Sequence, residues 1–411
     1  MSLLVGLDVG TTAVKAAAFD EALRELGTGR APTPWRTVPT GAELDPDELF
    51  DAAAAAAREA VAAAGGARVA ALGIASMAET GVLLDGHGRP AVPSIAWHDT
   101  RGEPERLAHD LPSFPARTGL PASTLCTLVK YRWMRDHWPE ARNGTRWLNV
   151  AEWIVHRFGG DAHAELSLAS RTGFYDLHER RTSAEALAWA GAPGGLAPEA
   201  APAGTPMGTS EDGAVLAVGG HDHLAAAVGA GAAGEGDVLD SCGTAEAFVR
   251  ATAPLAPDAV ADAVDHGFTC GWHAVADRQA LLGALPSGAE LQRVLARHGI
   301  AADDRAAIEE AALEIERGDP GDAAARDYHA ALDDFGARGA DVLERMAGIA
   351  GPMRRLVATG GWAAGPAAQA VKARRLGPFD HSPGISQGAR GAALAAGRAA
   401  GLWDNALQEV T

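Results

Sequence analysis

The chain has 411 residues, 47% of them hydrophobic, and carries a formal net charge of −18. Its length predicts two domains, each with a core of its own. The acidic balance argues against non-specific binding to nucleic acid or to an anionic membrane surface, because both need a basic footprint. A small anionic ligand is compatible with it, since backbone N–H groups and a few cations can hold one locally.

Hydrophobic periodicity predicts alternating strands and helices along the chain. Strands are expected at 3–8, 13–19, 69–76, 82–85, 95–97 and 214–219. Helices are expected at 47–64, 125–136, 149–158 and from about 224 to 228. Residues 303–341 have a charged helical pattern, whereas 192–206 and 251–257 are rich in Pro and Ala and are typical of loops.

The cysteines and the N-terminal residues indicate the cellular compartment of the protein. Cys126, Cys242 and Cys270 are odd in number and form no CxxC pair, so we expect reduced thiols and a cytoplasmic protein. The first apolar run has no basic segment before it and is interrupted by Asp8, which is not typical of a signal peptide. Since no apolar stretch approaches the length of a membrane span, no membrane partner is expected.

A strand–turn–strand unit occurs near the start of each half of the chain. "GLDVGTTAVKAAAFD" covers residues 6–20 and "GEGDVLDSCGTAEAFVRAT" covers 234–252. Each contains a strand, a polar residue, a Gly-Thr turn and a second strand. Such a repeat predicts two related α/β domains. The Gly-rich stretch 229–236 marks their boundary, which gives domains at 1–232 and 233–411.

The first Gly-Thr turn is a candidate phosphate site. Thr11, Thr12 and the backbone N–H groups of the turn form a nest of donors for phosphate oxygens. Asp8 would repel a bare phosphate, but it suits a Mg²⁺ ion that it holds directly or through a water. Lys15 adds a cation for the transferred group. An ordinary hairpin is the alternative, and the Walker A pattern GxxxxGK[ST] is absent from the sequence.

Gly243 and Thr244 offer a matching turn from the second half. Two facing hairpins, one from each domain, would hold a polyphosphate across a cleft. Further along, "ATGGW" places Gly360 and Gly361 directly before a predicted helix, which suits the close approach of a nucleoside. The order of hairpin, hairpin and Gly-Gly-helix together indicates a nucleotide site.

The stretch "GGHDH" follows the strand predicted at 214–219. Asp222, at a strand end and before a helix, is placed to act as a general base for a hydroxyl in the cleft between the domains. Two alternatives stay open: Asp222 caps the helix, or His221 and His223 bind a metal as the HxH pair of a metallohydrolase. The sequence has no second HxH and no HExxH motif to support the metal.

Together these motifs resemble those of the FGGY carbohydrate kinases, of the xylulokinase and gluconokinase kind. That family belongs to the superfamily of actin, hexokinase and the heat-shock chaperone ATPases. Besides "GLDVGTTAVKAAAFD" and "GGHDH", the matching motifs are "DSCGTAEAF" for phosphate and "ATGGWAAGPAAQAVKARRLG" for adenosine. They stand in family order across nearly the whole chain. The resemblance implies two ribonuclease H-like (actin-like ATPase) domains with the active site in the cleft between them.

The resemblance implies ATP-dependent phosphorylation of a hydroxyl on a sugar, sugar acid or polyol, with Mg²⁺ as cofactor. Asp222 would be the catalytic base, and Asp8 would help to position the Mg²⁺. Contacts to ATP and its phosphates are implied for Thr11, Thr12, Lys15, Gly243, Thr244, Gly360 and Gly361. A homodimer is a further expectation that rests on the family alone.

Two other stretches resemble sugar-facing parts of the family. "IASMAETGVLLD" places Glu79 after a strand, where relatives have an acidic or His sugar contact. "AWHDTR" resembles the family pattern W-x-D-x-R, so Trp97 is expected to offer an apolar face to the sugar, and Asp99 and Arg101 to bind its hydroxyls. His221 is also expected to bind the substrate. The alternatives are a plain loop at Glu79 and a structural ion pair between Asp99 and Arg101.

The second half departs from the family pattern. Where relatives often have three consecutive glycines in the adenosine motif, this chain has Trp362, whose indole would stack near the adenine or block it. The second domain is also short and lacks a stretch like H-L-x-G-x-R-x-P. Two rivals therefore stay open: a sugar- or nucleotide-binding sensor without catalysis, and a partner-stimulated ATPase. "SLASRTGFYDL" also resembles the family, but no catalytic role is assigned to it.

Overall fold

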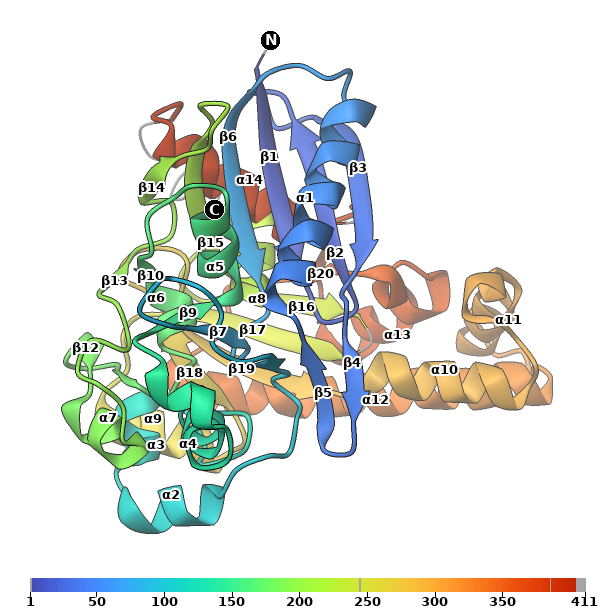
Figure 1. Ribbon diagram of the computed structural model, residues 1–411. Coiled ribbons are helices and arrows are strands. Elements are labelled where there is room, and N and C mark those ends of the chain that lie inside the picture. The colour runs from blue at the N-terminus through green and yellow to red at the C-terminus, as the bar shows by residue number, and fades with distance from the viewer. Residues whose placement is uncertain (1, 244, 385, 404–411) are drawn as a thin grey trace.

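A computed structural model describes residues 2–243, 245–384 and 386–403 of the chain. Thr244, which is predicted to contact phosphate, lies outside these residues. The described residues form two six-stranded mixed sheets, one from each half of the chain, with helices on their faces (Figure 1).

The first sheet has the strand order β14–β15–β6–β1–β2–β3. Its strands are β1 (Leu3–Val9), β2 (Ala13–Phe19), β3 (Glu25–Pro32), β6 (Val69–Ser76), β14 (Pro206–Thr209) and β15 (Val215–His221). Strands β1, β6 and β15 are parallel, and Ser76 pairs with Val9 on one side and with His221 on the other. Because parallel strands end at the same edge, Asp8 and Asp222 meet where open α/β sheets bind ligands.

Helices cover both faces of the first sheet. α1 (Pro46–Ala63) begins after an Asp45 N-cap and packs on β2 and β3. α14 (Gln387–Ala399) packs on the other face, on β1, β6 and β15. Gly6 and Gly73 lie under α14, where a Cβ atom would collide with the helix backbone. Glycine at these positions lets α14 lie close to the sheet.

The second sheet has the strand order β18–β19–β17–β16–β20–β21. Its strands are β16 (Asp237–Cys242), β17 (Glu246–Thr252), β18 (Thr269–Trp272), β19 (Gln279–Leu285), β20 (Arg355–Thr359) and β21 (Asp380–His381). β16 forms an antiparallel hairpin with β17 and pairs in parallel with β20. Since Ser241 pairs with Thr359, the Gly243 turn and Gly360 lie at the same edge of this sheet.

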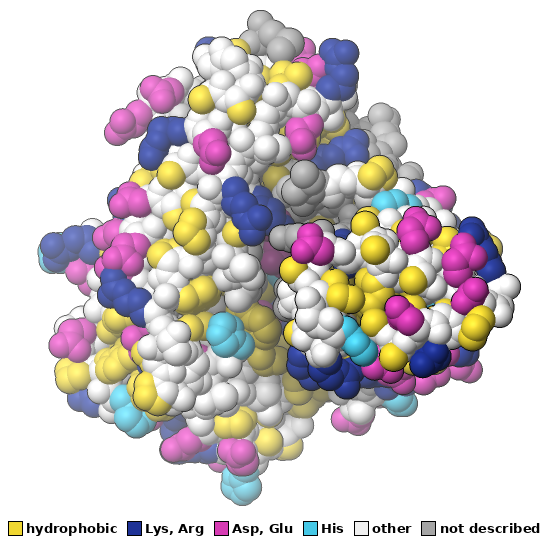
Figure 2. All heavy atoms as spheres, turned by 90° about the vertical axis from the view of Figure 1, so that its right-hand side faces the viewer, with side chains coloured by type: hydrophobic (Ala, Val, Ile, Leu, Met, Phe, Trp, Pro, Cys, Tyr) yellow, Lys and Arg dark blue, Asp and Glu magenta, His cyan; other side chains and the backbone are white. Residues whose placement is uncertain are grey.

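Four helices project from the side of the second sheet (Figure 1). They are α10 (Ser287–Arg297), α11 (Ala306–Glu316), α12 (Ala323–Ala350) and α13 (Pro366–Leu376). Figure 2 views this side of the molecule and shows acidic and basic side chains intermingled over it. Nowhere in the described part of the chain is a helix both long and apolar enough to cross a membrane.

The remaining elements are short and connect or flank the sheets. The helices are α2 (Pro104–Asp110), α3 (Phe114–Thr118), α4 (Thr127–His137), α5 (Val150–Arg157), α6 (Leu166–Ala169), α7 (Ala184–Ala190), α8 (Asp222–Gly229) and α9 (Pro257–Asp265). The strands are β4 (Arg36–Val38), β5 (Gly41–Leu44), β7 (Gly81–Leu84), β8 (Ser94–Ile95), β9 (Arg146–Asn149), β10 (Ala164–Glu165), β11 (Tyr175–Asp176), β12 (Arg181–Thr182) and β13 (Ala200–Ala201). Single 3₁₀ turns occur at Pro139–Asn143, Ala302–Asp304 and Gly361–Ala363.

Several predicted segments differ from the structure. The strand expected at 95–97 ends at Ile95, as β8, and the loop expected at 192–206 contains β13. The helix after the Gly-Gly turn begins at Asp222 rather than near Leu224. The helical stretch 303–341 is divided between α11 and α12, because Gly318 and Gly321 adopt positive φ in the turn between them. The domain division at 232/233 stays a prediction. Helix α14 follows the second sheet in the chain but packs on the first.

Candidate active site

Asp222 lies where β15 passes into α8. A bulge interrupts the pairing of β15 with β6 between Val218 and Gly220, and Gly220 has a φ of +100°. A Cβ atom on Gly220 would lie 2.6 Å from the Ser167 hydroxyl, so only glycine fits. The bulge and the glycine turn the chain so that Asp222 opens α8, with its side chain 21% exposed.

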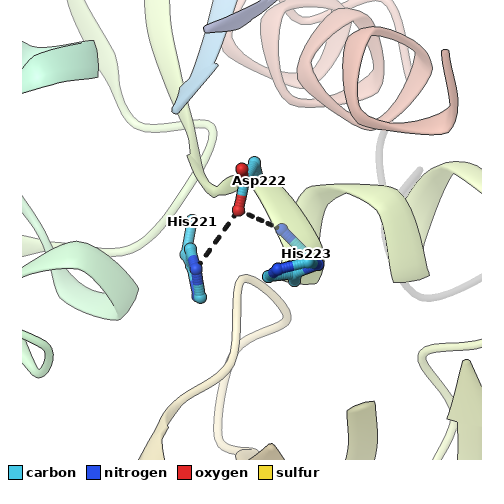
Figure 3. A group of neighbouring side chains, drawn as sticks. All are labelled: His221, Asp222 and His223. Carbon is cyan, nitrogen blue, oxygen red and sulfur yellow. Dashed lines mark hydrogen bonds and ion pairs between the residues drawn. The ribbon is translucent and has the colours of Figure 1, made fainter. Parts of the chain in front are cut away.

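Two histidines and a backbone N–H surround the Asp222 carboxylate (Figure 3). Its Oδ1 accepts from the His223 N–H at 2.7 Å and lies 3.2 Å from Nε2 of His221. Burial alone would raise the pKa of Asp222, but His223, His221 and the N–H donor hold it below its usual value. The carboxylate is therefore ionised at neutral pH and can accept a proton.

His221 is held in place through its backbone. Burial lowers the pKa of its ring to about 3, so the ring is neutral. The His221 N–H donates to Oγ of Ser167 at 3.0 Å, and this hydroxyl donates to Oε2 of Glu165 at 2.6 Å. Glu165 also accepts from the backbone N–H groups of Ser167 and Leu168. The segment that forms β10 and α6 thus holds the backbone of His221, the residue before Asp222, in position.

Asp8 lies beside Asp222 and the start of α14. A Cβ atom on Gly388, in the first turn of α14, would lie 2.8 Å from the carboxylate carbon of Asp8. Burial and the Asp222 charge raise the pKa of Asp8 to about 6, although Lys15 lowers it. A cation between the two carboxylates would relieve their repulsion.

Two tryptophans anchor the first Gly-Thr turn. Nε1 of Trp97 donates to the Thr11 hydroxyl at 2.8 Å, and Nε1 of Trp35 donates to the Thr11 carbonyl at 2.7 Å. Thr12 is exposed, and Lys15 pairs with Asp8 across the two strands. The turn residues and Lys15 therefore lie at the same end of the hairpin, and Trp97 is hydrogen-bonded to the turn through Thr11.

The second turn also closes with a backbone hydrogen bond from its glycine, but one residue sooner than the first. The Gly243 N–H donates to the Ala245 carbonyl at 3.0 Å, as the Gly10 N–H donates to the Ala13 carbonyl at 3.2 Å. Gly288, the second residue of α10, lies directly against the Gly243 carbonyl. The structure thus places a second, similar turn at the edge of the second sheet, as predicted from the repeat.

Gly360 and Gly361 lie between β20 and α13, beside the second turn. Gly360 has a φ of +97°, and a Cβ atom there would collide with the backbone of Cys242. The Gly361 carbonyl accepts from Nη2 of Arg305 at 2.5 Å. Both glycines are therefore engaged within the protein, and Trp362 follows them directly.

Glu79 lies in a strained turn after β6, with a φ of +60°. Its Oε1 accepts from Nε of Arg171 at 2.7 Å and lies 2.5 Å from Nη2. Nη1 of Arg171 donates to Oγ1 of Thr269, the first residue of β18, at 2.6 Å. The side chains of Glu79 and Arg171 are only 10% and 9% exposed. Arg171 thus links the predicted sugar contact to the second sheet.

Asp99 and Arg101 form a buried ion pair. Asp99 accepts from Nε and Nη2 of Arg101 at 2.8 and 2.9 Å, and Arg101 also pairs with Glu43. Burial would raise the pKa of Asp99, but Arg101 holds it below its usual value. This geometry is that of the structural alternative, in which the pair supports the loop that carries Trp97.

Two buried lysines were not assigned from the sequence. Lys130 donates to the Trp97 carbonyl at 2.9 Å, and burial lowers its pKa to about 8. Lys372, in α13, lies 2.6 Å from Oδ2 of Asp240 and also pairs with Glu246. The sequence holds a signal for both, because the chain has only three lysines and the third is Lys15.

Two side-chain clusters have the spacing of metal ligands in the described residues. His221, Asp222 and His223 have ligand atoms within 4.8 Å of one another, and so do Asp240, Cys242 and Glu246. In the second cluster, both carboxyl groups are already paired with the Lys372 ammonium. For Mg²⁺, which prefers oxygen ligands, the neighbouring carboxylates of Asp8 and Asp222 are the better match.

Sequence comparison places the chain among known kinases. The sequence model of the FGGY family of carbohydrate kinases, N-terminal domain, matches residues 3–231. A xylulose kinase from Streptomyces rubiginosus is 32% identical over 246 residues, which are 56% of this chain and 50% of that protein. A glycerol kinase from Bordetella parapertussis is 33% identical over 220 residues, 50% of this chain and 43% of that protein. The match thus spans about half the length of these curated relatives.

Solved structures match over nearly the whole fold. A xylulose kinase from Rhodospirillum rubrum has a TM-score of 0.85 at 22% identity, over 98% of this chain and 91% of that one. Plasmodium falciparum glycerol kinase with ADP has a TM-score of 0.86 at 17% identity, over 100% of this chain and 92% of that one. These likenesses confirm the predicted fold of two actin-like α/β domains. With the family match over more than half of the sequence, they lead to one conclusion: the chain belongs to the FGGY family of carbohydrate kinases.

Proposed function

We propose that the chain transfers the terminal phosphoryl group of ATP to a hydroxyl of a sugar, sugar acid or polyol. The observation that carries this proposal is the Asp222 carboxylate, which is ionised, partly exposed and at the same sheet edge as Asp8 and the first Gly-Thr turn. The names of the relatives, xylulose kinase and glycerol kinase, support the same chemistry.

In this proposal Asp222 accepts the proton of the attacking hydroxyl. The His223 N–H and His221 orient the carboxylate, and the hydrogen bonds from His221 through Ser167 to Glu165 keep this segment in place. The hydroxyls and N–H groups of Thr11 and Thr12, and the Gly243 turn with Thr244, hold the phosphates. Lys15 offsets the charge on the transferred group.

Mg²⁺ fits the residues of this edge. Asp8 and Asp222 are oxygen donors whose mutual repulsion helps to raise the pKa of Asp8 to about 6, and a divalent cation removes that repulsion. Asp8 would hold the ion, directly or through a water. When bound, Mg²⁺ neutralises charge on the phosphates.

The acceptor pocket is proposed beside Asp222, at Glu79, Trp97 and His221. Glu79 can accept from sugar hydroxyls, since Arg171 contacts only one of its two carboxylate oxygens. Trp97 is half-buried and offers its ring to C–H groups. We propose that Asp99 and Arg101 act on the sugar through the Trp97 loop, because both are engaged in their own ion pair.

The cellular setting and assembly are also part of the proposal. Cys126, Cys242 and Cys270 are buried and free, which suits the reduced thiols of a cytoplasmic enzyme. The domains are proposed at 1–232 and 233–411, and the assembly as a homodimer. Light scattering of the purified chain would give the mass of the assembly, and a monomer would remove the homodimer.

ADP formation from Mg²⁺-ATP, measured against a panel of ketoses, aldonates and polyols, tests the proposed activity. We expect ADP to form only with a matching acceptor. ATP turnover that ignores every acceptor would support the partner-stimulated ATPase instead. Nucleotide binding without turnover would support the sensor. Tightly bound zinc in the purified protein would support the HxH metallohydrolase, for which His221 and His223 would be ligands.

A further inference from the structure

Trp362 follows the Gly360–Gly361 pair and lies across Gly288 from the Gly243 turn. The reacting end of the donor must face Asp222, so its other end points away from Asp222 and past the Gly243 turn. Gly288 lies next along this path, because a Cβ atom on it would collide with the Gly243 carbonyl. The same Cβ atom would lie 2.9 Å from Cδ1 and from Nε1 of Trp362. The indole therefore packs against the residue that borders the turn.

Arg305 holds the indole in this position from the start of α11. Its guanidinium lies 4.8 Å from the centroid of the Trp362 ring, within the range of a cation–π contact. It also donates to the Gly361 carbonyl at 2.5 Å and to the Ala302 carbonyl at 3.1 Å. The Trp362 ring and the glycine before it are thus fixed by one side chain.

Glu309, one helical turn further along α11, closes the start of α13. Its Oε2 accepts from the Ala367 and Ala368 N–H groups at 3.0 and 3.3 Å. Its Oε1 accepts from the Tyr328 hydroxyl at 2.6 Å, and the residue is 2% exposed. The N–H groups at this helix start, which would otherwise attract an anionic ligand, are therefore already used by the chain itself.

Little space remains beneath the indole. The pocket there has a volume of about 20 Å³, which holds about one water. Its apolar walls come from Leu291, Leu332 and Phe335, and its polar groups from Glu246, Ser287 and Lys372. A purine base could occupy this space only after Trp362 had moved away from Gly288 and Arg305.

We propose that Trp362 is the donor-specificity residue of this chain: it fills the nucleoside pocket, so the donor is held through its phosphates and its base adds little affinity. The inference rests on the proposed function, because it assumes that the Gly243 turn holds donor phosphates. Binding of the base must separate the indole from Arg305 and Gly288. The free energy needed for this separation weakens the binding of ATP.

Calorimetric titration of the full chain with Mg²⁺-ATP and with Mg²⁺-tripolyphosphate tests the proposal without any acceptor. Wild type should bind ATP at most about threefold more tightly than tripolyphosphate. Trp362→Gly should bind ATP about tenfold more tightly than wild type, with tripolyphosphate unchanged. Arg305→Ala should shift ATP binding in the same direction, whereas Arg293→Ala, which removes an exposed arginine of α10, should not.

The other outcomes overturn this inference, the proposed function or both. ATP affinity that is unchanged or lowered in Trp362→Gly overturns the inference, because the indole then does not obstruct the base. If a thermal melt shows that Trp362→Gly is not folded, Arg305→Ala decides. An ATP affinity of Arg305→Ala equal to that of Arg293→Ala then overturns the inference. Tighter ATP binding without phosphoryl transfer to any acceptor supports the inference and contradicts the proposed function. A wild type that binds neither ligand overturns both.

Discussion

The two Gly-Thr hairpins share a backbone plan but place their charges differently. Beside the first hairpin, Asp8 and Lys15 lie at the open edge of the sheet, near Asp222. Beside the second, Asp240 and Glu246 are buried and paired with Lys372. The first hairpin thus leaves its charges at the sheet edge, whereas the charges of the second hairpin are paired with Lys372 of α13.

A shift of one residue explains the difference. Asp8 in β1 and Ser241 in β16 occupy equivalent positions before their turns, and both are partly exposed. Asp240 is one residue earlier, so its side chain points to the opposite face of the sheet and is fully buried. A carboxylate near a Gly-Thr turn is therefore accessible to a ligand only when it lies on the exposed face of its strand.

The largest expected effect is at the edge of the first sheet, in Asp222→Asn. Loss of the proton acceptor should lower turnover by about 10²–10⁴-fold, with little change in the free energy of unfolding. Steady-state ADP formation and a denaturant titration measure the two quantities. Asp136→Asn, which changes an exposed carboxylate of α4, is the matched control. Turnover within a few-fold of wild type in Asp222→Asn would remove Asp222 from the base role.

On the buried side, Lys372→Met should act on stability. Removing the ammonium leaves Asp240 and Glu246 buried without their cation, and loss of one partner of a buried ion pair costs about 3–5 kcal/mol of unfolding free energy. Urea titration followed by circular dichroism measures it. Arg317→Met, which breaks an exposed pair on α11, should cost less than about 1 kcal/mol. Equal stability of the two variants would show that the second hairpin does not depend on this network.

Arg171→Gln tests a contact between the two halves of the chain. Glu79 would lose its charged donor, and because hydrogen bonds to charged groups contribute about 1.5–3 kcal/mol, the KM for the acceptor should rise about tenfold or more. The KM for ATP should stay close to its wild-type value, since Glu79 lies at the proposed acceptor pocket. A rise in the KM for ATP alone would move Arg171 to the donor site.

The last expected effect concerns the pH dependence of stability. Burial raises the pKa values of Glu152 and Glu165 from 4.5 to about 7. Both pKa values are higher in the folded state than in the unfolded state. The two carboxyls therefore make their full contribution to the unfolding free energy below pH 4.5, where both are protonated. That contribution is lost as the pH rises to about 7. The slope is up to about 1.4 kcal/mol per pH unit for each carboxyl that titrates.

Unfolding free energies of wild type and Glu152→Gln, measured from pH 4.5 to 7, test this titration. The decline with pH should be shallower in Glu152→Gln, because one of the two carboxyls no longer ionises. Glu199→Gln, on an exposed loop, should keep the wild-type slope. The same slope in all three chains would contradict the raised pKa of Glu152.

Much of the central fold could be predicted from the sequence. The strands at 13–19 and 69–76 are predominantly apolar, and their bounds agree with the structure. The repeated Gly-Thr turns located both hairpins, because glycine in a turn is a local signal. The strand β3 was not predicted, since "ELGTGRAP" contains glycine and proline and forms a strand only by pairing with β2.

Side-chain partners were harder to predict than elements. Asp99 and Arg101 stand two residues apart, and their spacing fits a sugar pocket and an ion pair equally well. Arg171 meets Glu79 from 92 residues away, and Arg305 meets Gly361 from 56 residues away. Such contacts depend on how the elements pack, which local patterns do not encode.

The central claim is that Asp222 serves transfer of phosphate to a hydroxyl acceptor. The most direct measurement follows the terminal phosphate of isotopically labelled ATP in wild type and Asp222→Asn, with the panel of ketoses, aldonates and polyols. The proposal predicts label on an acceptor with wild type and almost none with the variant. Label that appears only as inorganic phosphate, or on an acceptor equally with both proteins, would contradict it.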